Sequence, residues 1–324
     1  MDSTYCPRGN RRATKMTSNT KSGTVIERMD PIFVVGVQRS GTTMLRLMLN
    51  AHPHIAIPFE SDFIPKFHCR LGEYGDLQTP GHVARLLDDI SAQAFVKRGG
   101  LIRDRQAILA RRPDSYASLV ASIYEVYAVT EGKRRWGDKD PDNTIKMDII
   151  WRLFPGCQFV HIVRDGRAVA TSLRKLGWGS KNLLALARDW SWRVMLAHKM
   201  GMMIGPRHYV EIHYEDLVKS SKQVLRQVCA FLDEPFDDGM LDYHKQAQTV
   251  MPSDSLKYHQ SSVCAPDSGK IDSWHREMTL ADRALFDEVA GETLEAFGYA
   301  RDVGRRGGWR SRLMRLKYAV VDRW

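Results

Sequence analysis

Short apolar runs alternate with segments of helical periodicity along most of this 324-residue chain. Runs of the first kind are typical of strands buried in a parallel sheet. They predict strands over residues 31–37, 158–163 and 209–213. The segments that follow them predict helices over residues 42–50, 168–176, 182–203 and 279–297. Strands that alternate with helices in this way predict a three-layer α/β fold with a central parallel sheet.

The remaining segments divide the chain into a body and two ends. Residues 62–135 carry helical periodicity without a recognisable strand, which predicts a helical insert after the first strand–helix unit. Residues 1–30 are polar, show no periodicity and are predicted to be disordered. Residues 301–324 mix basic with apolar residues in an amphipathic pattern. We therefore expect one α/β domain over residues 31–300.

The net charge of +10 is concentrated at the ends of the chain. Residues 301–324 hold eight Arg and Lys against two Asp, and residues 1–30 hold six against three acidic residues. Basic ends of this kind contact anionic lipid or nucleic acid, or remain as solvated tails. Because the body is nearly neutral, we expect no nucleic-acid partner and regard an anionic membrane surface as the candidate partner of the tail.

Cysteine usage and hydropathy indicate a cytoplasmic protein. The five cysteines are scattered without a CxxC pair or a Cys/His cluster, which argues against a disulfide framework or structural zinc. No apolar run reaches the length of about 18 residues needed for a membrane span. His52 and His54 flank Pro53 and are interpreted as turn residues, since no third metal ligand is evident. No metal site is predicted.

A glycine-rich loop lies between the first predicted strand and helix. The segment from Gly36 to Thr43 has the form G-x4-G-T-T, which matches a phosphate-binding P-loop except that Thr42 replaces the lysine. Backbone N–H groups and the start of the helix favour an anion there, and Arg39 supplies a cation. The fold is therefore expected to be P-loop-like. A tight turn without a ligand remains the alternative.

A second candidate site follows the strand over 158–163. Arg164 stands at the carboxyl end of this strand, where open α/β sheets place their ligand contacts. Ser172 lies eight residues later on the next helix, so that a guanidinium and a hydroxyl could converge on one phosphate. Asp165 between them is a candidate helix cap.

Together these segments resemble the family of sulfotransferases that use 3′-phosphoadenosine 5′-phosphosulfate (PAPS). The motifs are VVGVQRSGTTMLRLMLNAHP, GDKDP, FVHIVRDGRAVATS, HYEDL and GKIDSWHR, and the resemblance spans roughly residues 31–299. The sequence RSGTT followed by LNAHP is closer to the tyrosylprotein and bacterial branch than to the steroid and phenol branch.

The resemblance implies roles for individual residues. The 5′-phosphosulfate would be held by Arg39, Ser40, Gly41, Thr42 and Thr43. The 3′-phosphate would be held by Arg164 and Ser172, with Tyr214 near the nucleotide. A segment over residues 261–270 would close over the nucleotide and contribute Lys270 as a second contact to the 3′-phosphate.

Sulfonate transfer is an in-line displacement that needs a base for the acceptor and cations for the sulfonate. In the resembling branch the base is a glutamate, which corresponds here to Glu60, and Asp62 and His68 are nearby alternatives. Lys139 and Arg39 would stabilise charge on the transferring group. The product would be 3′-phosphoadenosine 5′-phosphate (PAP), and no metal would be required.

The acceptor is left open by the sequence. A hydroxyl or amine on a small molecule, carbohydrate, lipid or peptide fits, and the insert over 62–135 is expected to shape its pocket.

Two other functions are alternatives to sulfonate transfer. A P-loop kinase or NTPase would require lysine at position 42 and an acidic magnesium ligand in place of Arg164. A non-enzymatic nucleotide-binding protein would retain the loop as a relic.

Overall fold

The structure is a computed structural model that describes residues 30–177, 179–260 and 262–303. Nearly all of the predicted disordered segment 1–30 and of the basic tail 301–324 lies outside these residues. Along the described chain, no helix is both long and apolar enough to cross a membrane.

A five-stranded parallel sheet forms the centre of the molecule, with the strand order β2-β3-β1-β4-β5. The strands are β1 (Ile32–Val35), β2 (Ile55–Ala56), β3 (Arg135–Lys139), β4 (Gln158–Val163) and β5 (Tyr209–His213). All four residues of β1 are buried, as its continuous apolar sequence predicts for a strand covered on both faces. The predicted parallel α/β architecture is confirmed.

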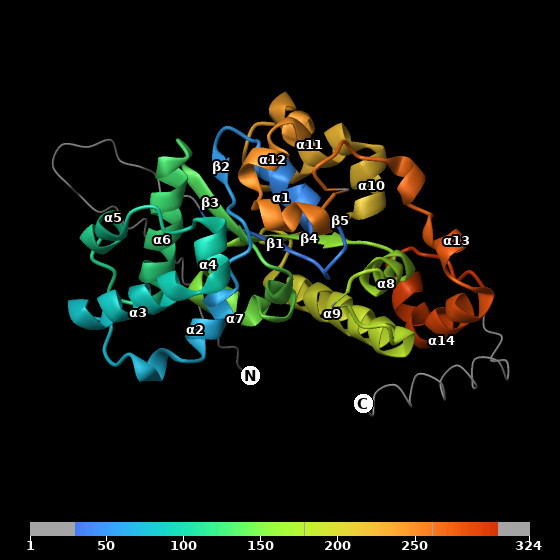
Figure 1. Cartoon of the computed structure of the whole chain (residues 1–324), viewed down its shortest axis with the longest axis horizontal. Helices are drawn as coiled ribbons and strands as arrows, with labels where there is room; N and C mark the ends of the chain where they lie inside the picture. Colours follow the sequence, from blue (N-terminus) through green and yellow to red (C-terminus); the bar gives the residue numbers. More distant parts are fainter. Residues whose placement is uncertain (1–29, 178, 261, 304–324) are drawn as a thin grey trace, which may run out of the picture.

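Helices cover both faces of the sheet, so the fold has three layers (Figure 1). One face carries α1 (Thr42–Asn50), α10 (Tyr214–Lys219), α11 (Ser221–Phe231), α12 (Ala247–Val250) and the 3₁₀ helix η3 (Asp238–Lys245). The other face carries α6 (Tyr116–Thr130), α7 (Met147–Leu153) and α9 (Leu183–Ile204). Alternate residues of β1 serve the two faces, because Ile32 packs with the first set and Phe33 with the second.

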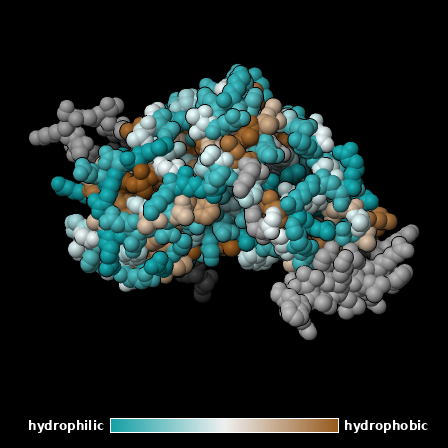
Figure 2. All heavy atoms as spheres, viewed as in Figure 1, coloured by the Kyte–Doolittle hydropathy of each residue, from teal (hydrophilic) through white to brown (hydrophobic). Residues whose placement is uncertain are grey.

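The insert between β2 and β3 is helical, as predicted, and lies at one end of the molecule (Figure 1). Its helices are α2 (Phe63–His68), η1 (Leu71–Glu73), α3 (Pro80–Ala92), α4 (Ala94–Gly99), α5 (Arg105–Ala110) and α6. The described surface facing the viewer is mostly hydrophilic, with apolar side chains in small separate groups (Figure 2).

The opposite end of the molecule is built from helices that follow β4 and from the C-terminal helices (Figure 1). These are α8 (Gly166–Arg174), α13 (Trp274–Glu277) and α14 (Leu280–Ala296), which pack with the first half of α9. Beyond α14, the backbone N–H groups of Asp302 and Val303 donate to Asp287 at 2.7 and 2.9 Å. Residues 301–303 are therefore anchored on α14.

Two strands and several element boundaries differ from the sequence predictions. The strands β2 and β3 were not predicted, since β2 has two residues and β3 reads RWGDK. Charged residues of β3 are buried because they have partners: Arg135 donates to the carbonyl of Leu232 and to the side chain of Gln158. The helix predicted over 168–176 begins two residues earlier, because Asp165 caps it.

Candidate active site

Residues beyond the carboxyl ends of the sheet strands line a cavity of about 860 Å³. The lining comes from the loop after β1, from Glu60, from one side of α8 and the residues just after it, from Tyr214 and from residues 255–277. This is the edge of an open parallel sheet at which ligands bind in α/β folds. The predicted residues that reach the cavity are Arg39, Gly41, Thr42, Thr43, Glu60, Arg164, Ser172, Tyr214 and Lys270.

The loop between β1 and α1 needs glycine at position 41. Gly41 adopts the left-handed region with φ of 95°, and an added Cβ would lie 2.4 Å from the ring of Tyr214. Within the described chain, no side chain caps the first turn of α1, so its N–H groups are available to an anion. The hydroxyl of Ser40 is buried and has no hydrogen-bond partner among the described residues.

Arg39 joins three separate segments around the cavity. Its Nε donates to the Ser172 hydroxyl at 3.0 Å, and its guanidinium also donates to the carbonyl of Tyr258 at 2.8 Å. Arg164 in turn donates to the carbonyl of Arg39 at 3.0 Å. Arg39 and Ser172 were assigned to opposite ends of the nucleotide, yet here they contact each other. The Ser172 hydroxyl accepts from Arg39 in this contact, so its own proton is available to a phosphate.

Arg164 is oriented from two sides and has donor capacity left. Its guanidinium lies 4.2 Å from the ring centroid of Tyr214, at cation–π distance. Its Nε is buried and has no partner among the described residues. An unpartnered buried donor is costly unless a ligand satisfies it, so this atom and the Ser40 hydroxyl fit an anionic ligand.

Glu60 and Lys139 form an ion pair beside the loop. Lys139 ends β3 and is fully buried, and its Nζ donates to Glu60 and to the Thr43 hydroxyl, the latter at 3.3 Å. Burial alone would raise the pKa of the Glu60 carboxyl, but the charge and hydrogen bond of Lys139, with the charge of Arg46, lower that pKa below its ordinary value. Glu60 is therefore a carboxylate at neutral pH.

The neighbours of Lys139 on β3 hold the strand end in place. Asp138 is buried and accepts hydrogen bonds from Tyr124 at 2.7 Å, from Asn143 at 2.7 Å and from Ser61 at 3.3 Å. Burial and the charge of Glu60 raise the pKa of Asp140 to about 7. The two aspartates of the GDKDP motif therefore have different surroundings on either side of the lysine.

Two alternatives to Glu60 do not line the cavity. Asp62 precedes α2 in the left-handed region, with φ of 51°. His68 lies at the end of α2 with its ring centroid 6.2 Å from that of Tyr116.

Lys270, the predicted second contact to the 3′-phosphate, does reach the cavity, where its Nζ lies 3.6 Å from the carboxylate of Asp267.

His259 was not predicted as a site residue. It lines the cavity and directly follows Tyr258, whose carbonyl Arg39 contacts. Burial, with the nearby positive charge of Lys139, lowers the pKa of His259 to about 4, so its imidazole is neutral. Phe95 and Arg98 of α4 also line the cavity and were missed. None of these three residues stands in a motif, and α4 and His259 are far apart in the sequence.

The pair His52 and His54 has a third neighbour that the sequence did not reveal. Glu234 lies close enough for the three side chains to face one metal ion. Both ring nitrogens of His52 are already engaged, with the carbonyl of Pro235 at 2.8 Å and the N–H of His54 at 3.1 Å. Glu234 accepts from Arg134 at 3.0 Å. These contacts account for both ring nitrogens of His52 and one carboxylate oxygen of Glu234. The absence of a metal at this turn stays a prediction.

Comparison with known proteins gives a consistent picture. A protein-tyrosine sulfotransferase of Drosophila melanogaster is 28% identical over 223 residues, which are 67% of this chain and 40% of that protein. The nodulation protein NoeE of Sinorhizobium fredii is 25% identical over 302 residues, covering 84% of this chain and 68% of its own length. The chain spans about half or less of the first curated relatives it matches, at 40% and 52%.

A solved structure shares the fold. The sulfotransferase domain of the Synechococcus PCC 7002 olefin synthase superimposes with a TM-score of 0.58 and 23% identity, covering 84% of this chain and 97% of that domain. The model of the sulfotransferase family matches residues 31–238, which include the glycine loop, Glu60, Lys139 and the Arg164–Ser172 motif. Since this match covers well over half of the chain, the resemblance seen in the sequence is confirmed and the chain belongs to the sulfotransferase family.

Proposed function

We propose that the chain transfers a sulfonate group from PAPS to an acceptor hydroxyl or amine and releases PAP. One observation carries the proposal: the glycine loop, Arg164, Ser172 and Glu60 line one cavity, and Lys139 lies behind Glu60 as its ionic partner. A nucleotide with phosphate groups at both its 3′ and 5′ positions has the charge distribution that these separate cationic regions match.

The nucleotide would bind along the carboxyl edge of the sheet. The N–H groups from Arg39 to Thr43 and the start of α1 would hold the 5′-phosphosulfate. The guanidinium of Arg164 and the hydroxyl of Ser172 would hold the 3′-phosphate. The unpartnered Nε of Arg164 supports this assignment, because a phosphate oxygen would satisfy it.

Transfer would proceed by in-line attack of the acceptor oxygen or nitrogen on sulfur. The new bond forms as the bond between sulfur and the bridging phosphate oxygen breaks, and its electron pair leaves with PAP. Glu60 would take the acceptor proton as that proton becomes acidic in the transition state. Lys139, which is buried beside Glu60, would balance the charge on the sulfonate and the departing oxygen.

The acceptor would enter between the insert and the segment before residue 260. The 3₁₀ helix η4 (Ser253–Tyr258) contacts α4 beside the cavity, since Arg98 donates to Asp254 at 2.9 Å and to Ser255 at 2.7 Å. Phe59 and Phe95 supply apolar lining on this side. These walls favour a hydroxyl carried by an apolar or aryl group among the possible small-molecule, carbohydrate, lipid and peptide acceptors.

A metal would have no assigned task in this reaction. The arginine and lysine side chains around the cavity would neutralise the phosphosulfate, and Thr42 stands where NTPases have the lysine that works beside magnesium.

We further propose that the protein is cytoplasmic and binds peripherally to an anionic membrane surface. The charge of residues 301–324 supports this placement.

Incubation with ³⁵S-labelled PAPS and a panel of acceptors tests the function, with Lys139→Met as the inactive control. We expect label on at least one acceptor, together with release of PAP. Binding of PAP without transfer to any acceptor class would favour a non-enzymatic nucleotide-binding protein. Transfer from γ-labelled ATP, with none from PAPS, would establish the kinase alternative.

A further inference from the structure

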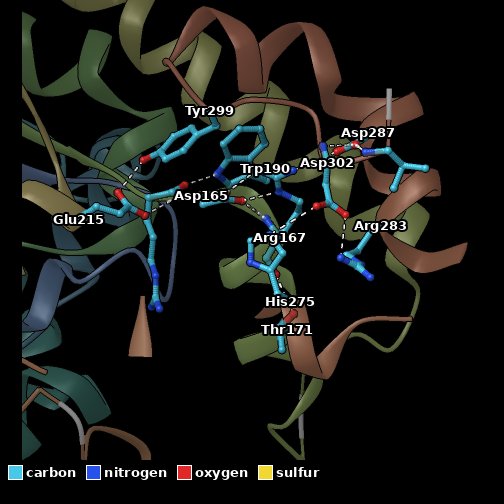
Figure 3. A network of polar contacts seen from close by, with 12 residues as sticks. Asp165, Arg167, Thr171, Trp190, Glu215, His275, Arg283, Asp287, Tyr299 and Asp302 are labelled. Atoms are coloured by element: carbon cyan, nitrogen blue, oxygen red, sulfur yellow. Dashed lines mark hydrogen bonds and ion pairs between the residues drawn. The ribbon is translucent and has the colours of Figure 1, made fainter. Parts of the chain in front are cut away.

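Behind Arg164, a chain of polar contacts leads away from the cavity toward the C-terminal part of the described chain (Figure 3). It includes Glu215 and Tyr299 on one side of Asp165, and Arg167 with Asp287 on the other. Glu215 and Tyr299 are not among the residues that line the cavity. Any influence they have on a ligand must therefore act through residues that do line it.

The backbone around Arg164 is held on both sides of its peptide linkage to Asp165. The carbonyl of Arg164 accepts from the indole N–H of Trp190 at 3.2 Å, and the N–H of Asp165 donates to Glu215 Oε1 at 3.1 Å. The same peptide unit thus has both of its polar groups tied to side chains. This fixes the direction in which the Arg164 side chain leaves the end of β4.

Tyr299 holds Glu215 in place. Its hydroxyl donates to Glu215 Oε2 at 2.8 Å, so the two carboxylate oxygens of Glu215 serve two different partners. Burial, with the negative charge of Glu215, raises the pKa of Tyr299 far above its ordinary value. The hydroxyl therefore keeps its proton, and the carboxylate is its acceptor.

The start of α8 is fixed from the other side. Asp165 accepts from the backbone N–H of Arg167 at 2.8 Å and from its guanidinium at 2.7 Å, and both side chains are buried. Arg167 also reaches Asp287 of α14 at 3.3 Å. Since α8 carries Ser172, the two predicted contacts to the 3′-phosphate are both anchored to the C-terminal part of the fold.

We propose that Glu215 and Tyr299 are positioning residues, which aim Arg164 and thereby set the preference for nucleotides that carry a 3′-phosphate. The inference rests on the proposed function, in which Arg164 contacts that phosphate. The 5′ end of the nucleotide would lie on the β1–α1 loop, and within the described chain neither residue hydrogen-bonds to this loop. The loop is linked to Arg164 through the Arg39 carbonyl, which is a backbone group and not a contact to the nucleotide. Loss of the hydrogen bond between Glu215 and Tyr299 should therefore weaken contacts to the 3′ end more than those to the 5′ end.

The test compares PAP with 5′-AMP, which lacks the 3′-phosphate, by calorimetric titration of the full chain. Tyr299→Phe removes the hydrogen bond to Glu215 and also the 3.1 Å contact between the Tyr299 hydroxyl and His213 Nδ1. Loss of the bond to Glu215 should weaken the binding of PAP about two- to ten-fold, the range expected for one net hydrogen bond. The affinity for 5′-AMP should be unchanged. Tyr74→Phe is the matched control, because the Tyr74 hydroxyl also donates to a carboxylate at 2.8 Å, that of Asp89 in the insert. It should alter neither affinity.

A second pair of variants separates positioning from stability. Glu215→Gln keeps an acceptor for the N–H of Asp165 and a polar partner for the Tyr299 hydroxyl, so it should keep most of the preference for PAP over 5′-AMP. Glu215→Ala removes both partners and should lose this preference. This pair also decides the matter if Tyr299→Phe does not fold. Equal weakening of PAP and 5′-AMP, or an unchanged preference in both Tyr299→Phe and Glu215→Ala, would overturn the proposal. Wild-type protein that does not prefer PAP would instead refute the proposed function.

Discussion

Replacing Glu60 by Gln separates the chemical role of this residue from its structural role. The substitution keeps the shape of the side chain and removes its charge and basicity. In the structure, the carboxylate of Glu60 is the ionic partner of Lys139, whose side chain has no exposed surface. Two consequences follow, one for turnover and one for the stability of the fold.

The loss of turnover can be bounded from general-base catalysis, which contributes typically about 10²- to 10⁴-fold. We therefore expect the kcat of Glu60→Gln to fall by at least about 100-fold. PAP affinity should change little, because the residues assigned to the two phosphates remain. Asp62→Asn is the control, since Asp62 does not line the cavity and should leave kcat nearly unchanged.

The loss of stability follows from the burial of Lys139. Removing one partner of a buried ion pair typically costs about 3–5 kcal/mol, because the remaining charge is left uncompensated. The hydroxyl of Thr43, at 3.3 Å, offers Lys139 partial compensation, so we expect the lower part of this range. Because the folded-state pKa of Glu60 lies below the ordinary 4.5, this contribution is present above that pH and is lost as the pH falls through the folded-state value.

The double variant Glu60→Gln/Lys139→Met distinguishes the two roles. Urea denaturation at neutral pH should show that it recovers much of the stability lost in Glu60→Gln, because no unpaired charge remains buried. Its turnover should stay at the level of the single variant or below. Near-normal turnover in Glu60→Gln would refute the reasoning and move the base to another residue that lines the cavity, with His259 the first candidate.

Three further predictions concern metal, pH and membrane. Sulfonate transfer should persist in excess chelator; a loss that magnesium reverses would contradict the proposed mechanism. Since burial raises the pKa of Asp140 to about 7, its ionisation costs stability as the pH rises from its ordinary value toward 7. The free energy of unfolding of wild type should therefore fall by about 3 kcal/mol relative to Asp140→Asn between pH 5 and pH 8 in urea denaturation, and parallel pH profiles would count against this. Truncation after Val303, which spares the anchored residues, should weaken binding to anionic vesicles by about 1 kcal/mol per basic residue that reaches the surface, and unchanged binding would exclude a membrane role for the tail.

The phosphate-binding part of the site could be predicted because each motif is local. The loop after β1 and the segment from Arg164 to Ser172 are each a strand, a turn and the start of a helix, so sequence spacing fixes their geometry. β1 is a continuous apolar run and β4 is apolar except for Gln158 and His161, and both were therefore predicted as buried strands. The match between the predicted and observed bounds of β4 and α1 follows from this.

Other parts depend on contacts that the sequence does not display. β3 reads RWGDK and was missed, although it pairs with β1 and carries Lys139, because its charged residues find partners only in the folded protein. The same holds for His259 and for Arg98, which reach the cavity from an irregular segment and from the insert. Their placement is set by tertiary packing rather than by periodicity.

The direct test of the central claim is a calorimetric comparison of PAP and 5′-AMP with wild type and Arg164→Ala. A charge-assisted contact to phosphate contributes about 1.5–3 kcal/mol, or roughly ten- to a hundred-fold in affinity. We predict that wild type binds PAP more tightly than 5′-AMP, and that Arg164→Ala removes this advantage while 5′-AMP binding stays nearly constant. Equal affinities of wild type for the two nucleotides, or equal weakening of both in the variant, would contradict a site built for PAPS.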